Sequence, residues 1–395
     1  MVQQSHVIDP PVQELDWDLW QPHHHELRTD VRAWIERDIR PFVDDWEAAD
    51  PPGFSRELFR AAAEQRLFGW KFGESVGGNG ADFLADAVTV EELARCGSGG
   101  VAAALGAHKD LGAYYLWRFG TDEQRARWVP PAMRGESITA LGVTEPHAGT
   151  DVASIRTRAV RQPDGDWVLN GSKTFITNGS WADVLVIAAA TSPEGGHHGM
   201  TLFVVEKDDP GFVSTRIPTL GWRASHTGEL SFTDVRLPAD RALGGEDMID
   251  QGFVCIMRNF QWERVCMALG ASVAARRVLD EGAALLVERH GRIPDAWRPR
   301  LADLDAEVRA VRSLTLHALR KYLHGEDAVR EVSMAKLEAS TLSVKVSDTV
   351  LQVFGAAGLG EVRWIQRALR DARLNPIGGG TTEIMREVVG RTFGL

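Results

Sequence analysis

Residues 156–179 read RTRAVRQPDGDWVLNGSKTFITNG, and here the helical pattern of the chain gives way to short β-rich segments. Turn signals at Pro163-Asp164-Gly165 and at Asn170-Gly171 separate these segments, as is typical of hairpins. The stretches DVLVIAAAT, GMTLFVVEKDD and GELSFTDVRLP continue the same pattern further along. We therefore expect a small antiparallel β domain over residues 139–247.

The segment before this domain, residues 1–138, reads as one helix after another. The stretch HELRTDVRAWIERDIR spaces its apolar side chains at helical intervals, and Pro41 is expected to break that helix. Further on, TDEQRARWVPPAMRG opens with a capping box formed by Thr121 and Gln124. We expect this helix to stop at Pro130-Pro131.

The segment after the β domain, residues 248–395, contains much longer amphipathic stretches. DQGFVCIMRNFQWERVCMALGASVAARRVLDEGAALLVERH is the longest, and two further helical stretches follow it. Long helices joined by short breaks are typical of an up-and-down four-helix bundle. The three parts are expected to pack together, because no low-complexity linker separates them.

Composition excludes several classes of protein. Asp and Glu number 55 against 44 Lys and Arg, a formal charge of -11, which argues against nucleic-acid binding and against an acidic membrane surface. Three cysteines without CxxC spacing fit a reducing cytoplasm rather than a disulfide or zinc framework. The polar N-terminus has no apolar signal core. We interpret His23, His24 and His25 as a solvated helix start, so no metal site is expected.

Four stretches distributed along the chain carry a resemblance to one protein family. They are ALGVTEPHAGTDVASIRTRAV, LNGSKTFITNG, LGWRASHTGELSFTDVRLP and LRDARLNPIGGGTTEIMREVVG. In this order they resemble the signature segments of the acyl-CoA dehydrogenase family of flavoproteins. The resemblance implies a mainly α fold: an N-terminal helical domain, a small antiparallel β-barrel and a C-terminal four-helix bundle. It also implies FAD as the cofactor.

The resemblance assigns cofactor contacts to particular positions. The residues expected to contact the flavin or its phosphates within the chain are Leu141, Val143, Thr144, Thr150, Phe175, Ile176, Thr177, Thr381 and Glu383. A second set matches residues that complete the cofactor site of a neighbouring subunit: Arg289 and the stretch 352–358, with Gln352, Phe354 and Gly355. A homotetramer or homodimer is therefore expected. The segment 289–300 is shorter than in the family and lacks its Phe-Gly and Gln, so the adenine end would be held differently.

The catalytic position shows the most informative departure from the family. Many members carry the base in a Tyr-Glu-Gly-Thr loop, where this chain has Gly378, Gly379, Gly380 and Thr381. The isovaleryl and long-chain branches instead place a glutamate before an arginine on a C-terminal helix, and NFQWERVCMALG matches with Glu263 and Arg264. A solvated charge pair is the ordinary alternative for such a dipeptide. Its apolar flanks favour a poorly solvated Glu263 with a raised pKa.

The resemblance implies a mechanism and partners. Glu263 would take the α-proton of an acyl thioester while hydride passes to flavin N5, giving a trans-2-enoyl product. The backbone N–H of Gly379 would hold the thioester carbonyl, and Thr150, Arg264 and Gly380 would contact the substrate. Electrons would pass to an electron-transferring flavoprotein.

Three other functions remain open on the sequence alone. The thioester could be carried by an acyl carrier protein, the chain could be a flavin monooxygenase, or it could bind thioesters without flavin. Glu263 argues against the second, and the short 289–300 segment favours the third. Neither the acyl chain nor the choice between CoA and carrier protein follows from the sequence, apart from a weak preference for branched or longer acyl groups.

Overall fold

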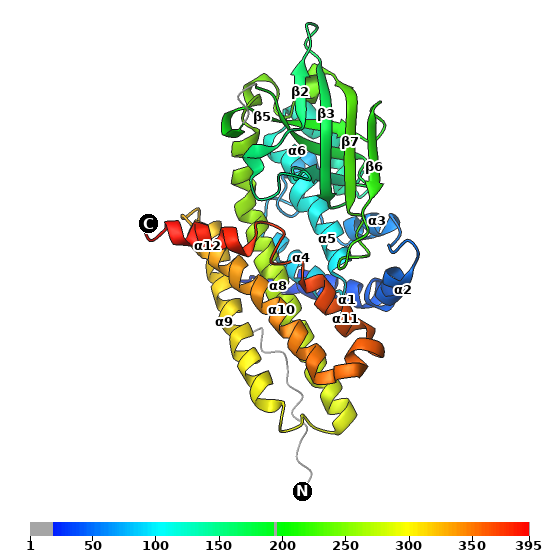
Figure 1. Ribbon diagram of the computed structural model, residues 1–395, viewed down its shortest axis with the longest axis vertical. Helices are drawn as coiled ribbons and strands as arrows, with labels where there is room; N and C mark the ends of the chain where they lie inside the picture. Colours follow the sequence, from blue (N-terminus) through cyan, green and yellow to red (C-terminus); the bar gives the residue numbers. More distant parts are fainter. Residues whose placement is uncertain (1–18, 193–195, 395) are drawn as a thin grey trace.

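Helices precede and follow a single sheet in the computed structural model, which describes residues 19–192 and 196–394 (Figure 1). The sheet lies at one end of the molecule, and the long C-terminal helices extend to the other end (Figure 1). This arrangement confirms the predicted mainly α fold with a central β domain. The N-terminal stretch, for which no signal core was expected, lies outside the described residues.

Seven α-helices form the described N-terminal part: α1 (Pro22–Asp38), α2 (Val43–Ala48), α3 (Glu57–Glu64), α4 (Phe83–Ala94), α5 (Gly99–Ala107), α6 (Ala113–Phe119) and α7 (Asp122–Met133). The first of these buries Leu27, Val31 and Trp34 and ends three residues before Pro41, as predicted. A π-helical turn, His108–Gly112, joins α5 to α6.

The capping box predicted for α7 is present, since the Thr121 hydroxyl accepts from the Gln124 amide and the Gln124 side chain accepts from the Thr121 amide. The predicted stop at Pro130-Pro131 is wrong, because α7 continues to Met133 with both prolines inside its last turn. Val129 and Ala132 are fully buried there, and this packing holds the last turn in place.

The sheet contains β1 (Thr139–Gly142), β2 (Arg158–Arg161), β3 (Trp167–Ile176), β4 (Val184–Ala190), β5 (Met200–Glu206), β6 (Phe212–Arg216) and β7 (Gly228–Leu237). The strand order is β1-β4-β2-β3-β7-β6, with β5 beside β4. Most neighbours are antiparallel, as expected, while β1 and β2 both pair with β4 in parallel. A separate apolar cluster that includes Leu169, Phe203 and Phe232 fills this domain.

The two turn signals in residues 156–179 have different outcomes. Pro163-Asp164-Gly165 forms the turn between β2 and β3, as predicted. The turn predicted at Asn170-Gly171 is wrong, because β3 runs through both residues with a register shift between Leu169 and Gly171. Gly171 has φ +141°, and a Cβ there would lie 2.6 Å from Thr157. The glycine therefore allows a close backbone approach at a bulge.

Five helices form the C-terminal part: α8 (Gly252–His290), α9 (Arg298–Leu323), α10 (Val329–Gly360), α11 (Arg363–Ala372) and α12 (Thr382–Arg391). The helices α8, α9 and α10 pack against one another, and α10 also contacts α11 and α12. Gly355 leaves the helical conformation with φ 52° and ψ -128°, so α10 is kinked near its end. None of the described helices has the combination of length and apolar character needed to cross a bilayer.

One side chain joins all three parts of the fold. The carboxylate of Asp371, on α11, accepts a hydrogen bond from the Gly99 amide at 2.8 Å, at the start of α5. Its other oxygen accepts from the Trp222 amide at 2.7 Å, in the loop between β6 and β7. Burial raises the pKa of Asp371 to about 6, and the two amide donors oppose that rise. The charge is therefore held by backbone dipoles rather than by water.

Candidate active site

The glycine loop that follows α11, residues 373–381, turns sharply before α12. Gly379 and Gly380 have φ values of 64° and 99°, in the left-handed region that favours glycine. The loop ends where the Thr381 hydroxyl accepts from the Ile384 amide at 3.3 Å and caps α12. Two consecutive left-handed residues thus bring the backbone of the loop close to α8.

Glu263 faces this loop from the first half of α8. A Cβ atom placed on Gly379 would lie 3.7 Å from Oε1 of Glu263 and 3.1 Å from Cγ of Met267, one turn further along α8. A side chain at position 379 would therefore project directly at the Glu263 carboxylate. Side chains at position 263 of α8 and at position 379 of the loop would therefore reach the same small region.

The surroundings of Glu263 favour a weakly acidic carboxyl group. Its Oε2 atom is buried and has no hydrogen-bond partner among the described residues. Burial raises the pKa of Glu263 to about 7, while the charges of Arg264 and Lys336 oppose this rise and that of Asp110 adds to it. The interpretation of Glu263 as a solvated surface charge does not fit this environment.

Arg264, predicted to contact the substrate, lies beside the glycine loop. Its Nε donates to the Gly379 carbonyl at 3.4 Å, and its guanidinium lies 5.8 Å from the centre of the Phe260 ring. A Cβ on Gly380 would lie 3.6 Å from the same guanidinium. Glu263, Arg264, Gly379 and Gly380 are thus brought together, although they come from two segments more than 100 residues apart.

Lys336 was not identified from the sequence, because a lysine inside an amphipathic helix gives no signal of its own. It projects from α10, is fully buried, and donates to the Asn375 carbonyl at 3.0 Å and to the Gly380 carbonyl. Burial and the nearby charge of Arg264 lower the pKa of Lys336 to about 8. A buried cation therefore contacts the loop on both sides of Gly379.

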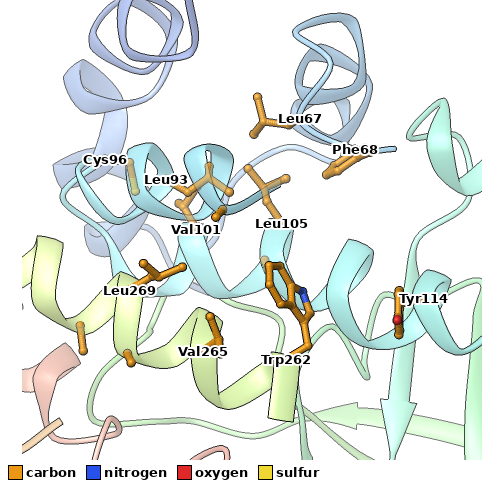
Figure 2. Close-up of a cluster of buried hydrophobic side chains, with 14 of the residues drawn as sticks. Leu67, Phe68, Leu93, Cys96, Val101, Leu105, Tyr114, Trp262, Val265 and Leu269 are labelled. Atoms are coloured by element: carbon orange, nitrogen blue, oxygen red, sulfur yellow. The ribbon is translucent and has the colours of Figure 1, made fainter. Parts of the chain in front are cut away.

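Apolar side chains fix the face of α8 next to Glu263. Trp262, Val265 and Leu269 project from α8 toward Leu93 of α4 and toward Val101 and Leu105 of α5 (Figure 2). Trp262 is completely buried, so rotation of α8 about its axis would expose a large aromatic surface. This packing sets the direction in which Glu263 points.

A buried ionic cluster lies on the far side of Trp262. Lys71, Asp86, Lys109 and Asp110 form it, with Lys109 bonded to Asp86 at 2.9 Å and to Asp110 at 3.1 Å. Trp262 Nε1 donates to Asp110 Oδ1 at 3.4 Å. Two lysines and two aspartates balance in charge, which makes their burial tolerable. The π-helical turn brings Lys109 and Asp110 into this cluster, and no sequence motif indicated it.

Among the residues expected at the flavin, Phe175 has the most distinctive geometry. It is 64% exposed, although it is a large apolar side chain, and its φ is 57°. A bulky residue held in the left-handed region is strained, and such strain is found most often at ligand sites. Its neighbour Ile176 is buried in the core of the β domain, while Thr177 is half-buried. Phe175 thus offers an open aromatic face.

The other expected flavin contacts in the β domain are arranged around one strand end. Thr144 is half-buried and Thr150 is exposed, whereas Leu141 and Val143 pack against the large core. The Val143 carbonyl accepts from Lys173 Nζ at 3.0 Å, and the Thr144 carbonyl accepts from the Thr174 amide at 2.9 Å. Each carbonyl thus has one hydrogen bond within the protein, and these bonds fix the backbone of both residues.

A buried lysine–glutamate pair stabilises that strand end and was also missed by the sequence analysis. Lys173 Nζ contacts Glu145 Oε1 at 2.7 Å, and the same carboxylate accepts from the Arg156 and Thr157 amides. Burial lowers the pKa of Lys173 to about 8, and the Glu145 charge opposes the change. The pair joins three segments of the β domain.

The second predicted set lies at the opposite end of α8. The Arg289 guanidinium lies 5.6 Å from the centre of the Phe354 ring and 3.7 Å from the Glu361 carboxylate. Gly355 forms the kink of α10, and the exposed Gln352 donates to Asp348 at 2.6 Å. Glu383, from the first set, is exposed in the first turn of α12. Arg289 and Phe354 are thus close together but far from Glu263.

The interpretation of the histidines as a solvated helix start is wrong for His24. His24 is 2% exposed, its Nδ1 accepts from the Gln21 amide at 2.9 Å, and its Nε2 lies 2.9 Å from Asp82 Oδ2. His23 Nε2 contacts the same oxygen at 2.9 Å. Since the Gln21 amide occupies Nδ1, the proton of His24 is on Nε2 and is donated to Asp82. The contact joins α1 to the start of α4.

Three family models match the chain in succession. Residues 21–136 match the acyl-CoA dehydrogenase N-terminal domain, residues 140–235 the middle domain and residues 250–394 the C-terminal domain. Together these matches extend over nearly all of the described residues.

Individual relatives agree with these matches. The long-chain specific acyl-CoA dehydrogenase of Rattus norvegicus mitochondria is 35% identical over 381 residues, covering 94% of this chain and 87% of the relative. A crystal structure of a probable acyl-CoA dehydrogenase from Mycobacterium abscessus is 40% identical with a TM-score of 0.88, covering 95% of this chain and 99% of the other. The prolyl acyl carrier protein oxidase AnaB is 26% identical with a TM-score of 0.87, covering 95% and 100%.

Proposed function

The chain belongs to the acyl-CoA dehydrogenase family, and we propose that it oxidises an acyl-CoA to a trans-2-enoyl-CoA with Glu263 as the base. Members of this family are FAD-dependent oxidoreductases that act on acyl-CoA, and this chain is one of them. The proposal concerns which residues carry the reaction, since the usual loop glutamate is replaced by Gly379.

One observation carries the choice of base. A side chain on Gly379 would point at the Glu263 carboxylate from 3.7 Å, so a loop base and a helix base would reach the same place. Loss of the loop carboxylate therefore leaves room for a carboxylate from α8. In the described residues around this loop, Glu263 is the acidic side chain in that position.

The acidity of Glu263 suits proton abstraction. A base works best when its pKa is near the working pH, and burial raises the pKa of Glu263 to about 7. The unpartnered Oε2 atom can accept a proton without first breaking a hydrogen bond. Arg264 and Lys336 keep part of the group ionised at neutral pH, and the ionised form is the reactive one.

The glycine loop supplies the second function, stabilisation of the thioester oxygen. Within the described chain, the carbonyls of Asn375, Gly379 and Gly380 are engaged by Lys336 or Arg264, while no acceptor faces the Gly379 amide. A free amide beside the base is suited to a carbonyl oxygen that gains negative charge as the α-proton leaves. The base and the oxygen-binding amide thus come from different segments.

The residues expected at the flavin fit such a group. The exposed and strained Phe175 offers a flat aromatic face. Thr144 and Thr177 are half-buried and Thr150 is exposed, and the Thr144 carbonyl is bonded to the Thr174 amide, next to Phe175. When bound, FAD supplies the acceptor for the hydride that leaves the β-carbon. We further propose electron-transferring flavoprotein as the electron acceptor and a homodimer or homotetramer as the assembled form, both by analogy with the family.

A carrier-protein thioester is the second candidate substrate. The similarity to the prolyl acyl carrier protein oxidase AnaB supports it, since the carrier changes only what lies beyond the thioester. The chemistry of Glu263 and Gly379 would be the same for both carriers.

The experiment that tests the proposal is anaerobic reduction of the FAD-loaded protein by a panel of thioesters. We expect bleaching of the flavin absorbance by at least one straight or branched acyl-CoA, with an artificial electron acceptor restoring the oxidised spectrum. The same acyl groups on a carrier protein would distinguish the two substrates. A protein that binds FAD but is bleached by no thioester of either kind would contradict the proposal.

A further inference from the structure

Two cations hold the glycine loop from opposite sides. Lys336 donates to the carbonyls of Asn375, at 3.0 Å, and of Gly380, and Arg264 donates to the Gly379 carbonyl at 3.4 Å. In a trans peptide the C=O and the following N–H point in opposite directions. Fixing the carbonyls of Gly379 and Gly380 therefore fixes the direction of the Gly380 and Thr381 amides, whereas Pro376, which follows Asn375, has no N–H. The Gly379 amide shares its peptide with the Gly378 carbonyl and lies between the anchored carbonyls of residues 375 and 379, so the cations restrict the backbone on both sides of it.

The attachment of the loop to α10 has a second point. Asn375 Nδ2 donates to the Ser343 hydroxyl at 2.9 Å, and Ser343 lies seven residues after Lys336 on the same helix. Lys336 and Ser343, about two turns apart on α10, thus both contact Asn375 at the start of the loop. Of these two residues, only Lys336 also contacts Gly380 near the end of the loop. The left-handed residues Gly379 and Gly380 have little conformational preference of their own. Without Lys336, Gly379 and Gly380 would keep one long hydrogen bond from Arg264, together with the backbone bonds beside them, from the Gly378 amide to Leu374 and from the Thr382 amide to Pro376.

Lys336 also acts on the proposed base. The charged groups that face Lys336 are Arg264 and Glu263 on α8 and Glu383 on α12. Its ammonium group is fully buried, so solvent screens its effect on Glu263 only weakly. Burial raises the pKa of Glu263, and Lys336 is one of the two cations that oppose the rise.

We propose that Lys336 is a positioning residue with two effects: it orients the glycine loop that presents the Gly379 amide, and it favours the ionised form of Glu263. The second effect rests on the proposed function, since it concerns Glu263 as a base. The first effect is a property of the fold. It can be measured without any substrate.

The loop can be tested by amide hydrogen exchange of FAD-loaded protein, followed on peptides that cover residues 374–385. Lys336→Met removes both hydrogen bonds while keeping similar volume, and we expect faster exchange in these peptides, by roughly 10-fold or more. Lys336→Arg keeps a donor and should restore much of the protection. The matched control is Lys345→Met on the same helix, where an exposed lysine pairs with Glu307. Exchange in residues 374–385 should not change there.

The charge can be tested separately through the pH profile of flavin reduction. Loss of Lys336 removes a charge that stabilises the carboxylate, so the pKa of Glu263 should rise and the profile should move to higher pH. Lys336→Gln retains one donor but no charge, so it should shift the profile as far as Lys336→Met while protecting the loop better. We expect a shift on the order of one pH unit and a rate loss of roughly 10- to 100-fold at neutral pH.

Each outcome decides one part of the proposal. Unchanged exchange in residues 374–385 of Lys336→Met would overturn the effect on the loop, whatever the activity. If Lys336→Met does not fold, the exchange of Lys336→Leu, which also lacks a donor, decides the effect on the loop, and the pH profile of Lys336→Gln decides the effect on Glu263. A wild-type flavin that no thioester reduces would contradict the proposed function and leave the loop measurement valid. Rapid reduction with an unshifted profile in both variants would overturn the effect on Glu263.

Discussion

The two ends of α8 are parts of one helix, yet their surroundings differ completely. Arg289 follows Glu263 by 26 positions, or about 39 Å at roughly 1.5 Å per residue. Around Glu263, side chains from α8 and α10 bind the backbone of the glycine loop in the interior. Around Arg289, the surface carries the exposed apolar residues Val287 and Leu359, at 45% and 62%.

We infer from this difference that one chain supplies parts of two cofactor sites. The family resemblance assigns two sets of residues to the cofactor. One set includes Thr381, in the loop beside Glu263, and the other includes Arg289, so the rigid helix α8 keeps the two sets far apart. One flavin cannot reach both ends of the same α8. A second copy of the chain, with the far end of its α8 against the cofactor of the first, is the arrangement that would use both sets. This is the physical basis for our prediction of an oligomer.

The largest effect is expected from a substitution of Glu263, in the first half of α8. Glu263→Gln keeps the shape of the side chain but removes the base, so flavin reduction by substrate should slow by roughly 10² to 10⁴-fold. Stopped-flow absorbance under anaerobic conditions measures this rate. The control is Glu288→Gln at the far end of α8, where the carboxylate is exposed and the rate should be unaffected. Equal rates for wild type and Glu263→Gln would mean that another group takes the proton.

A smaller effect is expected when the carboxylate is returned to the loop. In Glu263→Ala with Gly379→Glu, the new side chain would project into the space that Glu263 occupied, because a Cβ at position 379 lies 3.7 Å from its Oε1. We expect reduction roughly 10-fold faster than in Glu263→Ala alone, with a changed acyl preference. The recovery is only partial, because position 379 is left-handed and Met267 is close. No recovery at any chain length would show that the two positions do not converge.

The role of the end of α8 that carries Arg289 is tested by introducing a charge into the apolar surface around it. Leu359→Glu should prevent the copies from associating, and light scattering should then give the mass of a monomer. The FAD of such a monomer should dissociate several-fold faster on dilution, because the second set of contacts is lost. Val213→Glu on β6 is the control, since Val213 is similarly exposed at 58% but belongs to the β domain. If wild-type holoprotein is already a monomer, the far end has no such role.

The smallest effect is a pH-dependent change in stability. The pKa of Glu263 is about 7 in the folded protein and about 4.3 in an unfolded chain. The folded state therefore binds the proton more tightly, and stability falls as pH rises from the unfolded value through about 7. Glu263→Gln should raise Tm by roughly 2 to 4 °C at pH 8 and by less at pH 5. The same comparison for Glu288→Gln should show no dependence on pH.

The sequence predicted the fold where periodicity was strong. Leu27, Val31 and Trp34 have helical spacing, and they are buried along one face of α1. It failed where tertiary contacts override local preference. Asn170-Gly171 is a strong turn signal, but Thr157 approaches Gly171 and β3 continues. His24 lies in a polar stretch, but Asp82 and the Gln21 amide engage both of its nitrogens.

The candidate site was predictable only in part, for a related reason. Gly379 stood out because it breaks the loop pattern of many family members. Glu263 stood out because it matches the helix pattern of other branches. Lys336 and the ionic cluster around Asp110 belong to no short motif, and their partners lie far away in the sequence. Buried charges of this kind become recognisable only when the fold shows what they contact. A sequence pattern therefore finds the reacting groups more readily than the groups that orient them.

Asp371 has a consequence for recombining such proteins. Its two oxygens bind the amides of Gly99 and Trp222, so the three structural parts share one carboxylate. A Cβ on Gly221 would lie 2.2 Å from the Arg370 carbonyl, so the backbone of the β domain approaches α11 too closely there for any side chain. A chimera whose middle domain comes from a relative must therefore have a glycine at the position of Gly221, directly before the Trp222 amide that donates to Asp371. The residues around Gly99, Trp222 and Asp371 must therefore be exchanged together, and no single domain can be exchanged by itself.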